Sequence, residues 1–148
     1  MKRIVWDQPE RVMQFVAART GGEAYCDYAA LGLEQDGELV AGTVYNHRAH
    51  SNIWTHIAVD GGLAPAFICA GFRYPFIQLG CQSIAGAIRA DNATSLALAD
   101  RLGYMRRGLL PGACEDGADL IIVGMRKSEC RYLTGKYHDA LLAHLRRA

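Results

Sequence analysis

A stretch beginning at Ile84 constrains the fold of this chain more than any other part of the sequence. It is apolar and strand-like up to Asp91 and Asn92, two residue types that cap helix N-termini. An Ala- and Leu-rich segment follows and ends at Gly103, which precedes the aromatic Tyr104. The pattern predicts a strand, a short helix capped at Asp91 or Asn92, and a further strand starting near Tyr104.

The rest of the chain has equally local signals. Asp36–Gly37 is typical of a two-residue hairpin, and Asp7 with Glu10 fits a capping box. Tyr74–Pro75 should kink a helix or shift its hydrogen bonding. The predicted order is strand 4–6, helix from Pro9 to the Gly21–Gly22 pair, loop 23–29, strands 30–35, 38–47 and 52–59, a helix from Pro65 to Gly80, strand 83–90, the helix after Asn92, strands 104–112 and 119–126, a helical turn 129–132 and helix 137–147.

This order predicts an α+β fold. Early strands follow one another as meanders and later strands alternate with helices, which implies a mixed, mostly antiparallel sheet with helices on both faces. With 148 residues, 51% of them apolar, the chain suits one domain with a sizeable core. We expect a single domain over 1–148, with its core in 1–127 and a helical tail in 128–148.

The spacing Asn92-x-x-Ser95-(x)7-Gly103-Tyr104 resembles the late motif of the GCN5-related N-acetyltransferases, the GNAT superfamily. The element order over roughly residues 1–127 is similar as well, with one early helix reduced to a loop. The spacing is closest to the ribosomal-protein N-acetyltransferase pattern, in which Asn and Ser hold the cofactor. The tail, residues 124–133, resembles a subgroup met in phage genomes.

The resemblance implies that acetyl-coenzyme A is the acyl donor. Its pyrophosphate would lie at the turn before the Pro65 helix, because glycines let the backbone approach closely and a helix N-terminus favours anions. The residues of that turn are Gly61, Gly62, Leu63 and Ala64. The family's Gln/Arg-x-x-Gly-x-Gly/Ala motif does not occur there.

The chemistry of acyl transfer requires a base, an oxyanion donor and an acid. His56 is the predicted base, since histidine titrates near neutral pH and the corresponding GNAT strand often holds the base. Asp60 and Glu34 are weaker alternatives. The backbone N–H groups of Ile57 to Val59 are the predicted oxyanion donors.

The usual tyrosine acid of the family is replaced by Ala99 in this chain. Its role is either absent or moved, to Ser95 through a water molecule or to Tyr104. No nucleophile is placed for a covalent intermediate, so we expect direct attack of an amine on the thioester.

The acceptor site should be built by the loops 23–29 and 47–51 and the 109–117 hairpin. The candidate residues of this site are Tyr25, Asp27, Tyr28, His50, Trp54 and Glu115. A small-molecule or peptide amine is the expected acceptor. Two alternatives remain: modification of a nucleic-acid base, and a GNAT-like binding module without catalysis.

The composition of the chain limits which kinds of binding partner it is expected to have. A net charge of +1 gives no electrostatic reason for nucleic-acid binding, and no apolar run approaches the ~20 residues that cross a bilayer. The five cysteines show no metal-ligand spacing and are expected to be reduced thiols in the cytoplasm. We expect no metal, and a homodimer through the last hairpin is possible.

Overall fold

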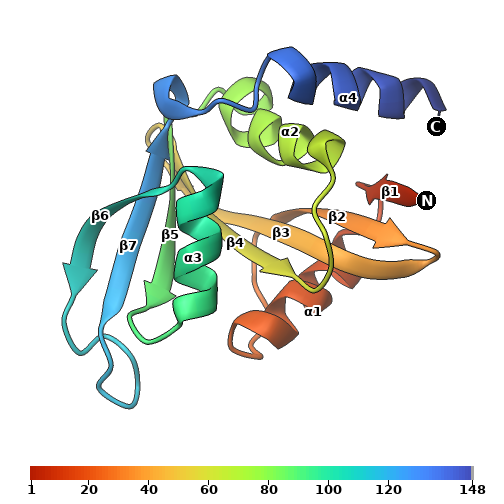
Figure 1. Ribbon diagram of the computed structural model, residues 1–148. Coiled ribbons are helices and arrows are strands. Elements are labelled where there is room, and N and C mark those ends of the chain that lie inside the picture. Colours follow the sequence, from red (N-terminus) through yellow and green to blue (C-terminus); the bar gives the residue numbers. More distant parts are fainter. Residues whose placement is uncertain (148) are drawn as a thin grey trace.

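The computed structural model describes residues 1–147, which form one seven-stranded sheet with helices against it (Figure 1). The strands are β1 (Lys2–Val5), β2 (Ala29–Gln35), β3 (Glu38–Ala49), β4 (Asn52–Val59), β5 (Ser83–Arg89), β6 (Met105–Leu110) and β7 (Leu120–Arg126). The helices and helical turns are α1 (Pro9–Thr20), α2 (Pro65–Arg73), the π-helical η1 (Tyr74–Gln78), α3 (Ala93–Leu102), the 3₁₀ turn η2 (Lys127–Glu129) and α4 (Gly135–Arg147).

The sheet is mixed and mostly antiparallel. Its order is β1-β2-β3-β4-β5-β7-β6, and only the β4–β5 pair is parallel. The predicted α+β fold is confirmed.

One face of the sheet is covered by α1. Val12 and Val16 are fully buried on this helix and lie against the backbone of Gly32 and Gly42 in β2 and β3. A Cβ atom at Gly32 would lie 2.7 Å from Val12 Cγ2, so only glycine permits this close approach. The packing explains why small residues stand in the middle of two central strands.

The opposite face is covered by α2, with α4 packed on α2 (Figure 1). The larger apolar core lies here and includes the buried rings of Tyr45, Phe67 and Phe76. In α4, Leu141 is buried while Leu142 and Leu145 are largely exposed. The amphipathic face predicted for this helix is therefore narrower than its three leucines suggested. No helix within residues 1–147 has both the length and the apolar content of a membrane span.

Local turn signals are mostly confirmed. Asp36 and Gly37 both have positive φ, as the predicted two-residue hairpin requires. The predicted shift at Tyr74–Pro75 is observed as the π-helical turn η1. The capping box at Asp7 is wrong: Gln8 is the N-cap of α1 and no side chain caps it. The helical turn expected at 129–132 lies instead at 127–129.

Candidate active site

The centre of the sheet opens where β4 and β5 separate. These parallel strands are paired at only three positions, which end with Trp54 opposite Ala85. Beyond Trp54 no pairing joins them, whereas β4 stays paired to β3 as far as Val59. A gap therefore divides the sheet between the second half of β4 and the second half of β5.

The backbone of β4 faces this gap. The Asp60 N–H donates to the Val40 carbonyl at 2.8 Å, and antiparallel pairs alternate between bonded and non-bonded positions. The N–H and C=O groups of Ile57 and Val59 consequently point away from β3 and toward β5. Gly86 supports this direction, because a Cβ atom there would lie 3.4 Å from the Thr55 carbonyl oxygen.

A cavity of about 370 Å³, here called the central cavity, occupies the gap. Four of the predicted site residues line it together: His56, Ile57, Asn92 and Ser95. Val59 and the turn residues Gly61, Gly62, Leu63 and Ala64 do not line it. The structure thus brings the predicted base beside the predicted Asn-x-x-Ser helix, and leaves the predicted phosphate turn further along β4.

His56 is held by contacts on two sides. Its Nε2 atom lies 2.8 Å from Asn46 Oδ1, and its ring packs against Tyr25 at a tilt of 34°, with centroids 4.4 Å apart. Burial, reinforced by the nearby His47, lowers the pKa of His56 to about 4. The expectation of titration near neutral pH is therefore wrong, and the imidazole is neutral at pH 7.

The N-terminus of α3 is capped as predicted. Asn92 Oδ1 accepts a hydrogen bond from the Ser95 N–H at 3.1 Å, and Gly103 ends the helix with φ +96°. Within residues 1–147 the Asn92 amide nitrogen and the Ser95 hydroxyl have no hydrogen-bond partner. Both groups line the central cavity and can bind a ligand.

Tyr104 also reaches the gap. Its hydroxyl lies 2.8 Å from Thr55 Oγ1, which in turn lies 3.2 Å from the Ala85 carbonyl. Burial raises the pKa of Tyr104 far above its ordinary value, so the phenol stays protonated. Sequence reasoning considered Tyr104 but missed Thr55, whose role depends on a contact 49 residues away in the chain.

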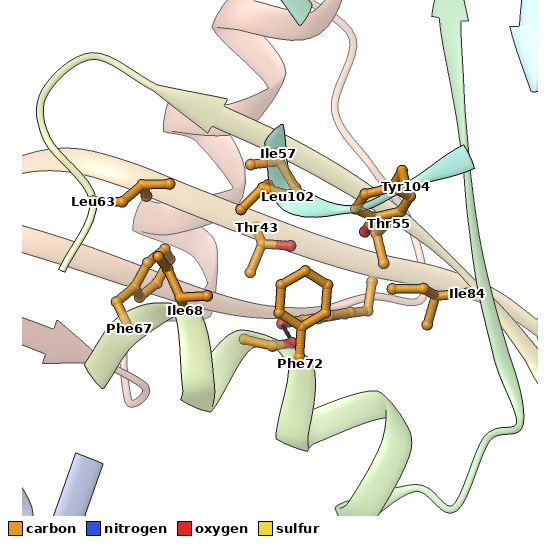
Figure 2. Close-up of a pocket in the computed structure, with 12 residues that line it drawn as sticks. Thr43, Thr55, Ile57, Leu63, Phe67, Ile68, Phe72, Ile84, Leu102 and Tyr104 are labelled. Atoms are coloured by element: carbon orange, nitrogen blue, oxygen red, sulfur yellow. Dashed lines mark hydrogen bonds between the residues drawn. The ribbon is translucent and has the colours of Figure 1, made fainter. Parts of the chain in front are cut away.

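A narrow cavity of about 40 Å³ lies on the α2 side of the same gap (Figure 2). Thr55, Ile57, Leu102 and Tyr104 line both this narrow cavity and the central cavity. Leu63 lines the narrow cavity at the end opposite Ile84 (Figure 2). The narrow cavity, which is mostly apolar, therefore reaches from the gap to Leu63 in the turn that precedes α2.

Two backbone groups of that turn, residues 61–64, already form hydrogen bonds within the protein. The Gly61 N–H donates to Val40 O at 3.1 Å, and the Gly62 carbonyl accepts from Lys2 Nζ at 2.8 Å. Ala64 is the N-cap of α2, and no side chain caps this end of the helix. The first-turn amides of α2 remain without a side-chain acceptor, and Lys2 adds a cation beside them.

The two alternative carboxylate bases are in ion pairs. The buried Glu34 accepts from Arg3 and from Arg11, each at 2.8 Å, and the Arg11 hydrogen bond is the main cause of its lowered pKa. Asp60 accepts from Arg19 at 2.9 and 3.0 Å, which likewise lowers its pKa. Neither carboxylate lines the central cavity, so His56 is the better-placed base.

The predicted acceptor loops contribute less than expected. Of their candidate residues, Tyr25 lines the central cavity, whereas Asp27, Tyr28, His50, Trp54 and Glu115 do not. Arg89 does line it, and binds Asp91 at 3.1 Å and Asp116 at 2.7 Å. This ion-pair cluster, which the sequence did not reveal, joins the end of β5 to the β6–β7 loop beside the cavity.

The comparisons with known proteins agree with this architecture. No protein-family model matches the sequence, and no curated protein matches it at a significant level. Solved structures do match. The ribosomal-protein-S18-alanine N-acetyltransferase of Escherichia coli has 19% identity and a TM-score of 0.65, over 92% of this chain and 97% of that one. The spermidine N-acetyltransferase of Vibrio cholerae has 14% identity and a TM-score of 0.67, over 86% and 94%.

RimJ of Mycobacterium smegmatis, solved in complex with CoA-disulfide, has 27% identity and a TM-score of 0.59 over 80% of this chain. The matched part spans 61% of the RimJ chain. By these structural neighbours, the fold is that of the GNAT N-acetyltransferases. Within residues 1–147 no group of three or more His, Cys, Asp or Glu side chains is arranged to hold a metal ion.

Proposed function

We propose that this protein is an acyltransferase that moves an acetyl group from acetyl-coenzyme A to an amine. The observation that carries the proposal is the separation of β4 from β5 next to the Asn92–Ser95 end of α3. Within residues 1–147 it leaves the Ile57 amide without a strand partner, beside the cavity that the free donors of Asn92 and Ser95 also line.

In this proposal the donor lies along β4. The amides of Ile57 and Val59 bind its acyl and pantetheine portion, since they face the gap. Asn92 and Ser95 bind from the α3 side. The pyrophosphate lies at the turn of Gly61, Gly62, Leu63 and Ala64, where the N-terminus of α2 and Lys2 Nζ favour an anion.

The reaction forms a bond between the amine nitrogen and the carbonyl carbon, and breaks the bond between that carbon and the thioester sulfur. His56 takes the proton of the attacking amine, directly or through water, because its imidazole is neutral and oriented by Asn46. The Ile57 and Val59 amides stabilise the carbonyl oxygen as its negative charge develops. The thiolate takes a proton from water held by Ser95, while Tyr104, whose phenol stays protonated, can donate a hydrogen bond to it.

The acceptor enters beside Tyr25 and the Arg89–Asp91–Asp116 cluster. Aromatic surface with carboxylates nearby suits a small-molecule or peptide amine. A cytoplasmic location and the phage-associated subgroup complete the proposal and rest on the sequence alone.

Stabilisation by the donor is the first test. At about 100 times the dissociation constant, acetyl-coenzyme A should raise the free energy of unfolding by ~2.7 kcal/mol, which corresponds to a melting-temperature increase of roughly 5–10 °C. Acetyl phosphate, which offers an acetyl group without the coenzyme, is the control and should cause no increase. An unchanged melting temperature at millimolar acetyl-coenzyme A would reject the proposal. Binding without transfer to any amine of a broad panel would favour a binding module.

A further inference from the structure

A cavity of about 570 Å³, here called the outer cavity, opens beside β2, η1 and α4. It shares no lining residue with the central cavity. Its size falls within the ~300–1,000 Å³ typical of small-molecule sites. The proposed acyl transfer makes no use of it.

Aromatic rings form much of its wall. Trp6, Tyr28 and Tyr74 line the outer cavity, and Trp6 is 49% exposed although it is one of the most apolar side chains. Tyr74 is fixed in place by Tyr45, with ring centroids 4.8 Å apart. Tyr45 is itself anchored, because its hydroxyl donates to the Gly71 carbonyl. The wall therefore offers aromatic surface on which a flat ring can stack.

The π-helical turn η1 supplies two residues of the wall. The Leu79 N–H donates to the Tyr74 carbonyl at 2.9 Å, five residues back, next to Pro75. Tyr74 and Gln78, the first and last residues of this turn, both line the outer cavity. Single π-helical turns inside helices are uncommon and frequently lie at functional sites.

Among the described residues, 1–147, Arg73 is the only charged side chain that lines the outer cavity. Within residues 1–147 no carboxylate lies within 4.0 Å of its guanidinium group, and its one hydrogen bond is a long contact of 3.5 Å to the Leu133 carbonyl. The cavity therefore presents a cation with unused donors and no opposing acid. Among residues 1–147, this lining offers a guanidinium group to an anion and no carboxylate to a cationic amine.

We propose that the outer cavity binds a small planar anion, an aromatic ring or base that bears a carboxylate or phosphate. The ring stacks against Trp6 and Tyr74, and the anionic group pairs with Arg73 in a fork geometry. Gln78 lies at the rim, where its amide reaches polar atoms at the ring edge. The site is separate from the donor and acceptor positions of the proposed reaction.

The two tryptophans of the chain allow a direct test. Trp54 lies on β4 outside the outer cavity, so Trp54→Phe leaves Trp6 as the sole fluorescent reporter of this site. The protein is titrated with adenosine monophosphate and with benzoate, and in parallel with their neutral counterparts adenosine and benzamide. We expect a saturable change of Trp6 emission with an anion, and affinity weaker by about tenfold or more for its neutral counterpart. The two anions distinguish a nucleotide from an aromatic acid.

Arg73→Gln in the same background should weaken anion binding by about tenfold or more. The matched control is Arg106→Gln, an exposed arginine on β6 that should leave binding unchanged. The comparison of charged and neutral ligands needs no substitution in the cavity. It therefore tests the preference for an anion even if Arg73→Gln fails to fold. No saturable change with either anion, or equal affinity for charged and neutral ligands, would overturn the proposal. Binding lost in Asn92→Ala but retained in Arg73→Gln would place the ligand in the central cavity and would also overturn it.

Discussion

At the scale of single residues, His56 combines a fixed orientation with an unusual protonation state. Asn46 and Tyr25 hold the ring, and burial keeps it neutral. A group whose folded-state pKa is lowered stabilises the fold fully above its unfolded pKa of ~6.5. That contribution is lost as pH falls toward the folded value of about 4. If His56 is the base of the proposed reaction, activity and stability should change over the same pH window.

His56→Gln should reduce acyl transfer by roughly 10²–10⁴-fold, because the base is removed. In the unmodified protein the acid limb of the rate at saturating substrates should lie near pH 4 rather than near 6.5. The limb should vanish in the variant. A variant with the original rate and pH profile would show that His56 only packs in the sheet.

His56→Gln should also change how the free energy of unfolding depends on pH. Between pH 6.5 and 4 the unmodified protein should lose on the order of 3 kcal/mol more unfolding free energy than His56→Gln. Urea titrations across this range measure the difference, with His144→Gln as a control for a second histidine whose pKa burial lowers. Parallel pH profiles for the protein and the His56 variant would contradict the assigned protonation state.

Asn92 has a structural and a proposed functional role, which one substitution can separate. Asn92→Ala removes the cap on the Ser95 N–H and should cost about 1 kcal/mol of stability. Affinity for acetyl-coenzyme A, measured by calorimetry on folded protein, should fall in addition. Thr94→Ala, an exposed position in the same helical turn, is the control. Unchanged affinity in folded Asn92→Ala would leave Asn92 a cap alone.

At the scale of elements, the contact between α1 and the sheet depends on missing side chains. A Cβ atom at Gly42 would lie 2.9 Å from Val16 Cγ2 and 3.1 Å from Val12 Cγ1. Gly42→Ala should therefore destabilise the protein by about 1–3 kcal/mol through overpacking. Gly108→Ala on β6 is the matched control, since its nearest atom would be 3.7 Å away. Chemical denaturation of both variants gives the comparison, and equal stabilities would refute the tight packing.

Elements with strong local signals could be predicted from the sequence. The Asp36–Gly37 turn, a cap at Asp91 or Asn92 and the Gly103 stop were each predicted, and the structure has the turn, the stop and the cap at Asn92. The capping box at Asp7 failed because Gln8 occupies the N-cap. A local pattern does not say which of two neighbouring residues begins a helix.

The site was predictable only in part. The resemblance to the GNAT superfamily, which rests on the spacing in α3, indicated His56, Asn92 and Ser95, and these residues meet in one cavity. The partners Asn46, Thr55 and Arg89 depend on strand register and on where β4 leaves β5, which distant segments decide. The pKa of His56 likewise depends on burial by residues far away in the chain.

At the scale of the whole molecule, the sheet consists of two antiparallel parts, β1 to β4 and β5 to β7. The two parts are joined by the parallel pairing of β4 with β5, which involves only three residue pairs. Each part keeps its own antiparallel ladder when that short junction opens, so opening should cost less than global unfolding. Backbone amides of residues 52–54 and 83–85 should then exchange with deuterium faster than those at the β2–β3 centre. Mass spectrometry of peptides from these strands measures the order, and uniform exchange across the sheet would disprove it.

A ligand in the gap would span this junction. Binding at once to β4 and to α3, it would supply contacts that the backbone does not, and exchange at the junction should slow when acetyl-coenzyme A is present. The division that opens room for a donor thus also makes the ligand a structural link between the two parts of the sheet.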